Sequence, residues 1–544
     1  MKNKYETYSR EQLIDKILKL EKERYGLVWE DKEEEVAKRC DSELPLLKED
    51  CSKEIIRDTT LPYNIIIEGD NYHSLYTLNF THKKSIDLIY IDPPYNTGNN
   101  DFIYNDSYVD KTDRYRHSKW LSFMSKRLRL ARNLLSNKGL IFISIDENEF
   151  AQLKLLCDSI FTEKNFIIDL IWNSRKSVSN DTIVSLNHNH TLVYAKNIDI
   201  IQLNKVNYRL RGSKEKFSNP DNDPRGEWIA DPFDAPEIRV NLTYVIENPN
   251  TGKKYLPPKG RHWRTTEDEY KKFLADGRIV FGKTGKAKPQ LKRFYYEAEK
   301  KGIVSKSIWD DVGTTTNGTQ ELEKILGEKK FNNPKPVSFI LKILELASFK
   351  NSTILDFFAG SGTTGHAVLA MNRRDGGNRK FILCTNNDNN ICTEVTYPRI
   401  KKVTEGYADI SGIPANLKYY TQTFIPVITS DNDKRELVNR STEMLCITED
   451  CFERVRNRDN HSDFSIFKNA KKQMAIIYDE DSICECIEYL NEHNSKLKTI
   501  IYVFSYDHTY DSEDFKELTI NFSVKPIPEA IINVYRKISK MKKK

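Results

Sequence analysis

The sequence predicts an α/β fold built on a doubly wound, mostly parallel β-sheet. Short apolar runs with the length of buried strands alternate with longer amphipathic segments over residues 60–200, and the alternation returns after residue 331. Two of these runs, residues 86–91 and 353–357, end abruptly, the first at two prolines and the second at a glycine-rich turn. Alternating strands and helices are typical of a parallel sheet that has helices on both faces.

Composition sets the broad class of the protein. The chain has 544 residues, of which 38% are hydrophobic and 30% charged, which is enough for several domains. Lys and Arg number 85 against 79 Asp and Glu, and this small excess does not by itself indicate nucleic acid. No apolar stretch reaches the ~18 residues of a membrane span, and a charged segment stands where a signal peptide would be apolar. We therefore expect a cytoplasmic protein without a membrane partner.

Changes in amino-acid composition along the chain predict five segments. Residues 1–58 are a charged helical arm, 59–200 the first part of the sheet domain, and 201–325 a polar, turn-rich insertion. Residues 326–420 complete the sheet, and 421–544 form a separate small α/β domain. Within the first part, residues 118–135 show helical spacing, with one apolar face and Lys and Arg on the solvent side. Nine cysteines without CxxC spacing favour reduced packing residues over disulfides or a metal site.

The motif Asp92-Pro93-Pro94-Tyr95 directly follows the buried strand 86–91. Two prolines fix φ and lack N–H groups, so the carbonyls of Asp92 and Pro93 are free to accept hydrogen bonds. A planar amino group with two N–H donors suits this pair of acceptors, and Tyr95 offers a ring on which a flat base can stack. The alternative is a strand that ends in an ordinary proline turn with a solvated acid. The choice depends on the rest of the chain.

The second motif is the turn Gly360-Ser-Gly362-Thr-Thr-Gly365, which follows a strand and opens a helix. A lone GxGxxG is a weak signal, and the lack of a following Lys-Ser or Lys-Thr argues against a phosphate-binding P-loop. Asp356, just before the turn, would attract a sulfonium or ammonium group and repel a pyrophosphate. Both motifs stand at the carboxyl ends of predicted parallel strands, where ligands collect in such folds.

The insertion at 201–325 carries basic residues interleaved with aromatic ones. Such a mixture can meet phosphates with charge and bases with ring faces. A solvated insertion whose aromatic residues form its own small core would have a similar composition. The candidate DNA-binding residues are Lys259, Arg261, Trp263, Arg264, Lys292 and Arg293.

Taken in order, these motifs resemble the β class of S-adenosylmethionine-dependent DNA amino-methyltransferases, in which the catalytic motif precedes the cofactor motif. Further matches are Glu68-Gly69-Asp70-Asn71, Phe142-Ile-Ser-Ile-Asp146 and Asn333-Pro334-Lys335-Pro336, so that the resemblance covers roughly residues 60 to 410. Length, the N-terminal arm and Gly260-Arg-His-Trp-Arg264 are most similar to the modification (Mod) subunits of type III restriction-modification systems.

The resemblance implies a Rossmann-like methyltransferase fold with permuted motif order, and a target-recognition domain at 201–325. It implies site-specific methylation of the N6 amino group of a flipped-out adenine in double-stranded DNA, with Asp92, Pro93, Pro94 and Tyr95 as the catalytic residues. It also implies a homodimer and a restriction (helicase-nuclease) partner. The residues that it assigns to S-adenosylmethionine are Asp70, Asn71, Lys335, Asp356, Phe358, Ala359, Gly360, Gly362 and Asn386.

The chain departs from the family pattern in three places. The family has an acid where this chain has Asn386 and Asn387, followed by Asp388, so the ribose contact is unassigned. The family's His-Glu-Tyr stretch is replaced by His188-Asn189-His190, and nothing matches the segment beyond 420. Cytosine-N4 methylation, methylation of protein glutamine and a non-catalytic DNA-recognition subunit remain as alternatives. The acid that opens the proline motif favours adenine by resemblance.

Overall fold

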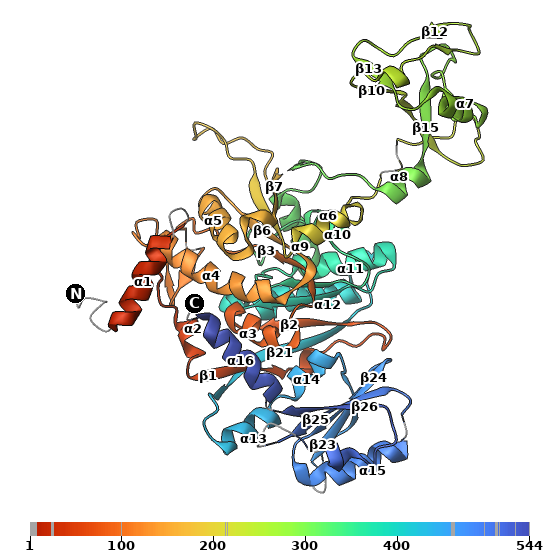
Figure 1. The fold of residues 1–544 in the computed structure, drawn as a ribbon. Coiled ribbons are helices and arrows are strands. Elements are labelled where there is room, and N and C mark those ends of the chain that lie inside the picture. The colour runs from red at the N-terminus through yellow and green to blue at the C-terminus, as the bar shows by residue number, and fades with distance from the viewer. Residues whose placement is uncertain are drawn as a thin grey trace. The chain divides into compact units, whose positions relative to one another are not determined.

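The computed structural model describes residues 8–22, 27–99, 101–212, 214, 216–458, 463–493, 495–505, 510, 512–527 and 529–542. The chain forms two compact units (Figure 1). The first combines Met1–Leu203 with Lys306–Lys544, and the second is Asn204–Ser305.

A ten-stranded sheet forms the centre of the first unit. Its middle six strands, from β21 to β6, are parallel to one another, whereas β8 is antiparallel to both β6 and β7, and β1 is antiparallel to β21. The predicted mostly parallel sheet is confirmed. In spatial order the strands are β1 (Glu43–Glu49), β21 (Asn416–Pro426), β2 (Tyr63–Glu68), β18 (Lys380–Thr385), β17 (Thr353–Asp356), β3 (Ile86–Ile91), β6 (Leu135–Ile145), β8 (Asn189–Ala195), β7 (Phe166–Trp172) and β16 (Ile308–Trp309).

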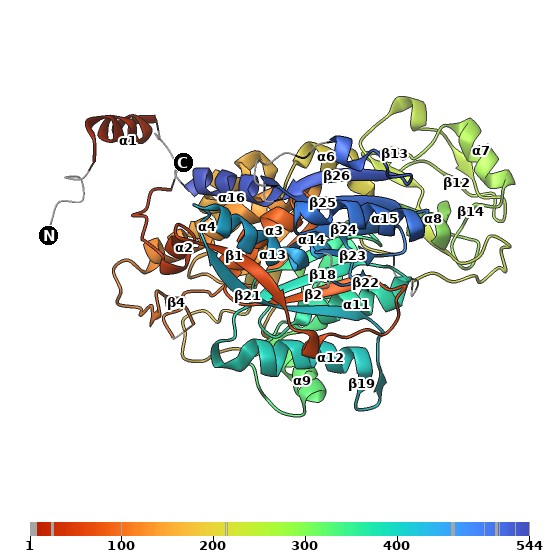
Figure 2. The same cartoon turned by 90° about the horizontal axis from the view of Figure 1, so that it is seen from below.

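Two groups of helices cover opposite faces of this sheet (Figure 2). One group is α3 (Asn71–Thr81), α4 (Arg116–Leu134) and α5 (Phe150–Phe161), which contact one another in that order. The other is α9 (Thr315–Leu326), α10 (Val337–Ala347), α11 (Thr363–Asp375) and α12 (Tyr397–Glu405). The sheet is therefore doubly wound, as predicted. Shorter elements of this unit are α6 (Ile198–Leu203), β4 (Ile103–Tyr104), β5 (Ser107–Tyr108), β19 (Gly406–Tyr407) and β20 (Ile410–Ser411).

The predicted N-terminal arm at 1–58 is only partly helical. Residues Arg10–Lys22 (α1) and Glu35–Arg39 (α2) form helices, but Glu43–Glu49 is the edge strand β1 of the main sheet. Leu46 and Leu47 are fully buried there, because the short apolar run is long enough to cover the neighbouring strand. The predicted boundary at 420 also differs from the structure, since β21 runs without interruption from Asn416 to Pro426.

The C-terminal part has a five-stranded sheet of its own, in the order β22 (Glu453–Arg456), β23 (Phe464–Lys468), β24 (Lys472–Ile477), β25 (Lys498–Phe504) and β26 (Phe522–Ile527). Its helices are α13 (Asp431–Asn439), α14 (Thr442–Glu449), α15 (Ile483–His493) and α16 (Glu529–Lys542). Helices α14 and α16 contact α3, and the Tyr535 hydroxyl donates a hydrogen bond to the Pro45 carbonyl over 2.8 Å. This part therefore belongs to the same compact unit as the main sheet.

The second unit has small sheets and a core of aromatic and aliphatic side chains. It ends at Ser305, so residues 306–325 of the predicted insertion lie in the first unit, where β16 pairs with β7 and α9 contacts α12. Its elements are β9 (Trp228–Pro232), β10 (Asp234–Pro236), β11 (Ile246–Glu247), β12 (Lys254–Tyr255), β13 (Arg261–Trp263), α7 (Glu267–Ala275), β14 (Ile279–Val280), β15 (Gln290–Phe294) and α8 (Tyr295–Lys301).

Two negative findings concern the described part of the chain. No helix in it is both long enough and apolar enough to cross a membrane. No group of three or more His, Cys, Asp or Glu side chains in it is placed to hold a metal ion. All nine cysteines are free thiols, and only Cys51 and Cys484 among them are exposed.

Candidate active site

The proline corner stands at the carboxyl end of β3, near the middle of the main sheet. Five of the six β3 residues are buried, so the strand holds the corner from a rigid base. The Trp120 indole N–H donates to the Pro94 carbonyl over 2.7 Å, and Asn96 takes a left-handed backbone conformation with φ of 58°. The corner is thus fixed on both sides of Tyr95.

Asp92 is engaged by two side chains in this conformation. The Tyr95 hydroxyl donates to one carboxylate oxygen over 2.8 Å, and the Lys335 ammonium forms an ion pair with the other. Lys335 also lies 3.1 Å from the Tyr95 hydroxyl. Burial and the charge of Asp92 raise the pKa of Tyr95, so this phenol stays neutral and can donate. Lys335, which resemblance assigns to the cofactor, contacts the carboxylate of the proline corner through its ammonium.

The glycine turn stands beside the proline corner because β17 pairs with β3 in parallel. Gly360 and Gly362 have φ values of 47° and 75°, which L-residues with side chains rarely adopt. A Cβ on Gly360 would approach the Phe331 ring to 3.1 Å. The turn therefore depends on glycine both for its backbone and for the close approach of Phe331.

Asp356 ends β17 and is almost completely buried. Its carboxyl accepts a hydrogen bond from the Phe358 backbone N–H at 3.0 Å and another from the Thr364 hydroxyl. Burial nevertheless raises the pKa of Asp356 to about 7. A cation near this carboxyl would favour its ionised form, so Asp356 is suited to binding a positively charged group.

Asp70 and Asn71 join a third strand end to the same edge. Asp70 caps α3 by accepting from the Tyr72 N–H over 2.7 Å, and the Asn71 amide donates to the Phe357 carbonyl over 3.0 Å. Arg127 of α4 reaches both residues and is fully buried, although the sequence predicts Lys and Arg of this helix in solvent. Sequence reasoning missed this contact because its partners are far away along the chain.

The resemblance assigns Asn386, directly after β18, to the cofactor, whereas the first acid after this strand is Asp388. Asn386 is exposed and its amide donates to Asp388. Partial burial raises the pKa of Asp388, and the charges of Asp70 and Asp106 raise it further. Asp388 is exposed like Asn386, and of the two it is the residue that can contribute a carboxylate to this edge of the sheet.

A buried cluster supports the residue that follows the proline corner. The Asn96 amide donates to the Glu149 carboxyl, which is fully buried, and His117 Nδ1 lies 2.7 Å from the same oxygen. Burial raises the pKa of Glu149, and that of nearby Asp146 to about 6. The sequence match ends at Asp146 and does not include Glu149, whose role was therefore missed.

His190, which replaces a family tyrosine, is used for packing. Its ring stacks on Phe150 with centroids 4.0 Å apart, and its Nδ1 lies 2.8 Å from a carboxylate oxygen of Asp169. One face of the imidazole and its Nδ1 are thus occupied by neighbours within the first unit. The structure therefore gives no support to a role for His190 beside a substrate ring.

The candidate DNA-binding residues of the second unit divide into two groups. Trp263 is fully buried and belongs to the core of this unit, where its N–H donates to the Tyr244 carbonyl over 2.7 Å. Lys292 is also buried and pairs with Asp223 at 2.8 Å. These two predictions are wrong for this conformation, because neither side chain is available to a nucleic acid. Arg261 is held by the buried Asp234.

Three of the predicted cations remain on the surface. Lys259, Arg264 and Arg293 are exposed. Arg293 lies 3.1 Å and Arg264 3.7 Å from the carboxylate of Asp231. Exposed ion pairs of this kind are weak, so these side chains can exchange the carboxylate for a phosphate.

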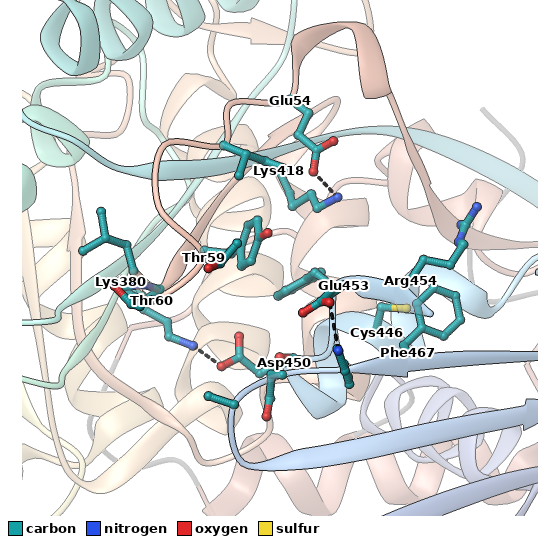
Figure 3. A pocket seen from close by; sticks show the side chains of 18 of the residues that line it. Glu54, Thr59, Thr60, Lys380, Lys418, Cys446, Asp450, Glu453, Arg454 and Phe467 are labelled. Atoms are coloured by element: carbon teal, nitrogen blue, oxygen red, sulfur yellow. Dashed lines mark hydrogen bonds and ion pairs between the residues drawn. The ribbon is translucent and has the colours of Figure 1, made fainter. Parts of the chain in front are cut away.

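A cavity of about 860 Å³ lies in the first unit, away from this site (Figure 3). Its walls include the first residues of β2 and β18, at the amino ends of the strands, whereas the motifs stand at the carboxyl ends. Lys380 pairs with Asp450 there, and Lys468 with Glu453. Because its cations and acids largely pair with one another, the cavity has no clear preference for a charged ligand.

Comparison with known proteins gives a consistent picture. Residues 86–397 match the family model described as DNA methylase. The StyLTI Mod subunit of a type III restriction-modification enzyme from Salmonella typhimurium is 38% identical over 353 residues, which are 59% of this chain and 52% of that protein. The type II methyltransferase M.KpnI from Klebsiella pneumoniae is 32% identical over 65% of this chain and 87% of its own length. The EcoPI Mod subunit from Escherichia phage P1 is 32% identical, over 69% of this chain and 66% of that protein.

Solved structures add little to this. The PvuII cytosine-N4-specific DNA methyltransferase covers 60% of this chain and 83% of its own, with 12% identity and a TM-score of 0.31. Similarity at that level supports no conclusion about function.

The chain spans about half the length of the first of these curated relatives. The family model, which covers more than half of the sequence, shows that the chain belongs to the DNA methylase family.

Proposed function

We propose that this chain transfers a methyl group from S-adenosylmethionine to the N6 amino group of adenine in duplex DNA. The observation that carries this proposal is the proline corner beside the glycine turn, which brings the acceptors of Asp92 and Pro93 next to a site suited to a cation. The matching curated relatives are named as modification subunits and methyltransferases, which supports the same activity here.

The residues at the glycine turn fit S-adenosylmethionine. Two left-handed glycines leave room for close approach of a ligand, and the buried carboxyl of Asp356 suits a sulfonium or ammonium group. Asp70 and Asp388 supply carboxylates for hydroxyl groups at the neighbouring strand ends. When bound, the cofactor supplies an electrophilic methyl group on its sulfonium sulfur.

The proline corner then holds and activates the amino group. The adenine amino nitrogen is a poor nucleophile, because its lone pair is delocalised into the ring. The Asp92 carboxylate and the Pro93 carbonyl each accept one amino hydrogen, which favours a pyramidal nitrogen with a directed lone pair. To do this, the amino group replaces the Tyr95 hydroxyl on Asp92. Asp92 is also the base placed to accept the proton that the methylated nitrogen loses.

Assembly and partners follow from the relatives and belong to the same proposal. We propose that the chain acts as a modification subunit, as a homodimer, and together with a restriction subunit. The second unit would recognise the target sequence through exposed cations such as Lys259, Arg264 and Arg293. Because a base in a duplex cannot reach the proline corner, the target adenine must rotate out of the stack.

Cofactor binding should depend on pH through Asp356. Below its pKa of about 7 the carboxyl is protonated and loses its attraction for a cation, whereas above it the attraction is complete. We therefore expect the affinity for S-adenosylmethionine to rise between pH 5.5 and pH 7.5, as measured by isothermal titration calorimetry. In Asp356→Asn the affinity should be lower, and its change over this pH range should be at most about twofold. An unchanged pH dependence in that variant would contradict the assignment.

Replacing Tyr95 should separate stacking from hydrogen bonding. Tyr95→Phe keeps the ring and loses the hydroxyl bond to Asp92, so we expect it to retain methyl transfer within about tenfold. Tyr95→Ala loses the ring and should cost about 1–3 kcal/mol of base stacking. Initial rates on one duplex measure both effects. A Tyr95→Ala variant as active as Tyr95→Phe would exclude the ring as a stacking platform.

Sequencing of methylated genomes tests the activity in cells. The chain is expressed in a bacterial strain that lacks its own adenine methylation, and the modified bases are mapped on the whole genome. We expect N6-methyladenine at one short recognition sequence, and none in a strain that carries the Asp92→Ala variant. Unmodified DNA in the expressing strain, with soluble protein present, would count against the proposal.

A further inference from the structure

The loop at residues 173–188, between β7 and β8, exposes an unusual number of apolar side chains. Val178, Ile183, Val184 and Leu186 are 70%, 104%, 76% and 51% exposed. Single exposed apolar residues are ordinary on protein surfaces, but a cluster of them marks an interaction site. Nothing in the methyl-transfer site described above uses this loop.

The register of the sheet places this loop on the same edge as Asp92. Trp172 at the end of β7 pairs with Asn189 at the start of β8, and His190 pairs with Ile145 at the carboxyl end of β6. Strands are about 4.8 Å apart, so the base of the loop lies about 10–15 Å along this edge from Asp92. In Figure 1 the loop extends away from the sheet beyond the end of β7. It can therefore reach a duplex whose target base occupies the proline corner.

The loop has an ordered neck below an exposed tip. The Asn187 amide donates to the carbonyls of Arg175 at 3.0 Å and Ser177 at 2.9 Å. The Ser185 hydroxyl accepts from the Ser179 backbone N–H over 3.0 Å. These bonds close the two arms of the loop against each other, so the residues between them form a narrow projection.

Cations stand at the neck, close to where the loop leaves the sheet. Arg175 and Lys176 are exposed, and neither forms an ion pair with a described residue, although the Arg175 Nε donates a hydrogen bond to the Ser177 hydroxyl over 2.8 Å. Below them Ser174 is buried, and its carbonyl accepts hydrogen bonds from the backbone N–H and hydroxyl of Thr315. The loop thus carries the exposed apolar residues Ile183 and Val184, with Asp181 beside them, on an anchored base that bears two positive charges.

This arrangement suits a duplex in which one nucleotide has been rotated out of the base stack. Flipping a base leaves a gap in the stack, and proteins hold distorted duplexes open by inserting apolar side chains between base steps. Ile and Val are stiff at χ1, so little conformational entropy is lost on insertion. Cations at the base of such a wedge meet the phosphates on either side.

We propose that the tip of this loop, Ile183 and Val184, enters the target duplex and fills the space left by the flipped adenine. Arg175 and Lys176 contact the flanking phosphates. This inference rests on the proposed DNA methyltransferase function and assigns to that function a wedge outside the two sequence motifs.

The test compares two duplexes that carry the recognition sequence found by genome mapping. In one duplex the target adenine is paired with thymine, and in the other it faces an abasic site, which makes flipping easy. We expect Ile183→Ser/Val184→Ser to lower kcat/KM about 10–100-fold on the paired duplex and at most about threefold on the abasic one. The control Ile56→Ser removes a half-exposed apolar side chain from the cavity at the opposite edge and should leave both rates unchanged.

Other outcomes separate the inference from the function on which it rests. Equal rates for the parent chain and the tip variant on the paired duplex would overturn the wedge alone. Equal losses on both duplexes would also overturn it, as would conversion of a dimeric parent into a monomeric variant in light scattering, which would assign the loop to a subunit interface. A parent chain that methylates neither duplex would overturn the proposed function and the wedge with it.

Discussion

Replacing Asp92 by alanine should abolish methyl transfer while the cofactor still binds. The substitution removes the carboxylate that accepts an amino hydrogen of the base, together with the counter-ion of Lys335. Loss of one such preorganised interaction costs about 10²–10³ in rate, and loss of the base for the departing proton adds to this. We expect kcat to fall at least about 10³-fold, with the dissociation constant for S-adenosylmethionine within about threefold of the parent.

Asp92→Asn is the matched control for this experiment. Its amide keeps the shape of the side chain and one acceptor oxygen, but it lacks the charge that pairs with Lys335 and cannot take up a proton. Its rate should lie between those of the parent and Asp92→Ala. Single-turnover rates and calorimetry measure the two quantities separately. Turnover by Asp92→Ala within tenfold of the parent would remove Asp92 from the mechanism.

Replacing Arg127 by methionine should have the largest effect on stability of any single change at this site. The guanidinium is fully buried, pairs with buried Glu34 at 2.7 Å and lies 3.6 Å from the centre of the Phe123 ring. Removing one member of a buried ion pair leaves the other charge without its partner, which costs about 3–5 kcal/mol. Lys126 lies 3.8 Å from Glu34 and compensates in part, so we expect a loss near the lower value.

The same substitution should weaken cofactor binding, because Arg127 also holds Asp70 and Asn71. Urea denaturation measures the free energy of unfolding, and Lys126→Met serves as the control. Its ammonium is partly exposed and farther from Glu34, so its removal should cost less than about 1 kcal/mol. Adding Glu34→Gln to Arg127→Met should recover part of the stability. An Arg127→Met chain as stable as the control would show that the buried pair contributes nothing.

Much of the central sheet and its two motifs could be predicted from the sequence. Buried parallel strands are short apolar runs, and the residues that stop them stand directly after them in the chain. Because all such strands end at one edge, Asp92 and Gly360 could be placed together although they are far apart in sequence. Prediction was most reliable where the evidence lay within a few consecutive residues.

The contacts within the site could not be predicted in the same way. Lys335 was assigned to the cofactor, but its ammonium forms an ion pair with Asp92, which stands 243 residues earlier in the chain. Arg127 looked like one of several solvated cations on an amphipathic helix, yet its partners bury it completely. Trp263 was expected to face DNA and instead lies in the core of the second unit. In each case the burial of a polar or aromatic side chain depends on distant residues, which local patterns do not reveal.

The predicted limits of the helical arm and of the sheet domain differ from the structure for a related reason. The edge strand β1 comes from the segment that was predicted as a helical arm, because its short apolar run is surrounded by charged residues. Its partner β21 crosses the predicted limit of the sheet domain. A short apolar run fits a strand and the buried side of a helix equally well, so the sequence alone did not separate the two.

The identity of the modified nucleoside shows directly whether the chain methylates adenine at N6. The purified chain is incubated with unmethylated duplex DNA and S-adenosylmethionine carrying a labelled methyl group, and the DNA is then digested to nucleosides and separated by mass spectrometry. We expect the label in N6-methyladenine with the parent chain and no label with Asp92→Ala. Label in N4-methylcytosine, or in protein rather than DNA, would contradict it.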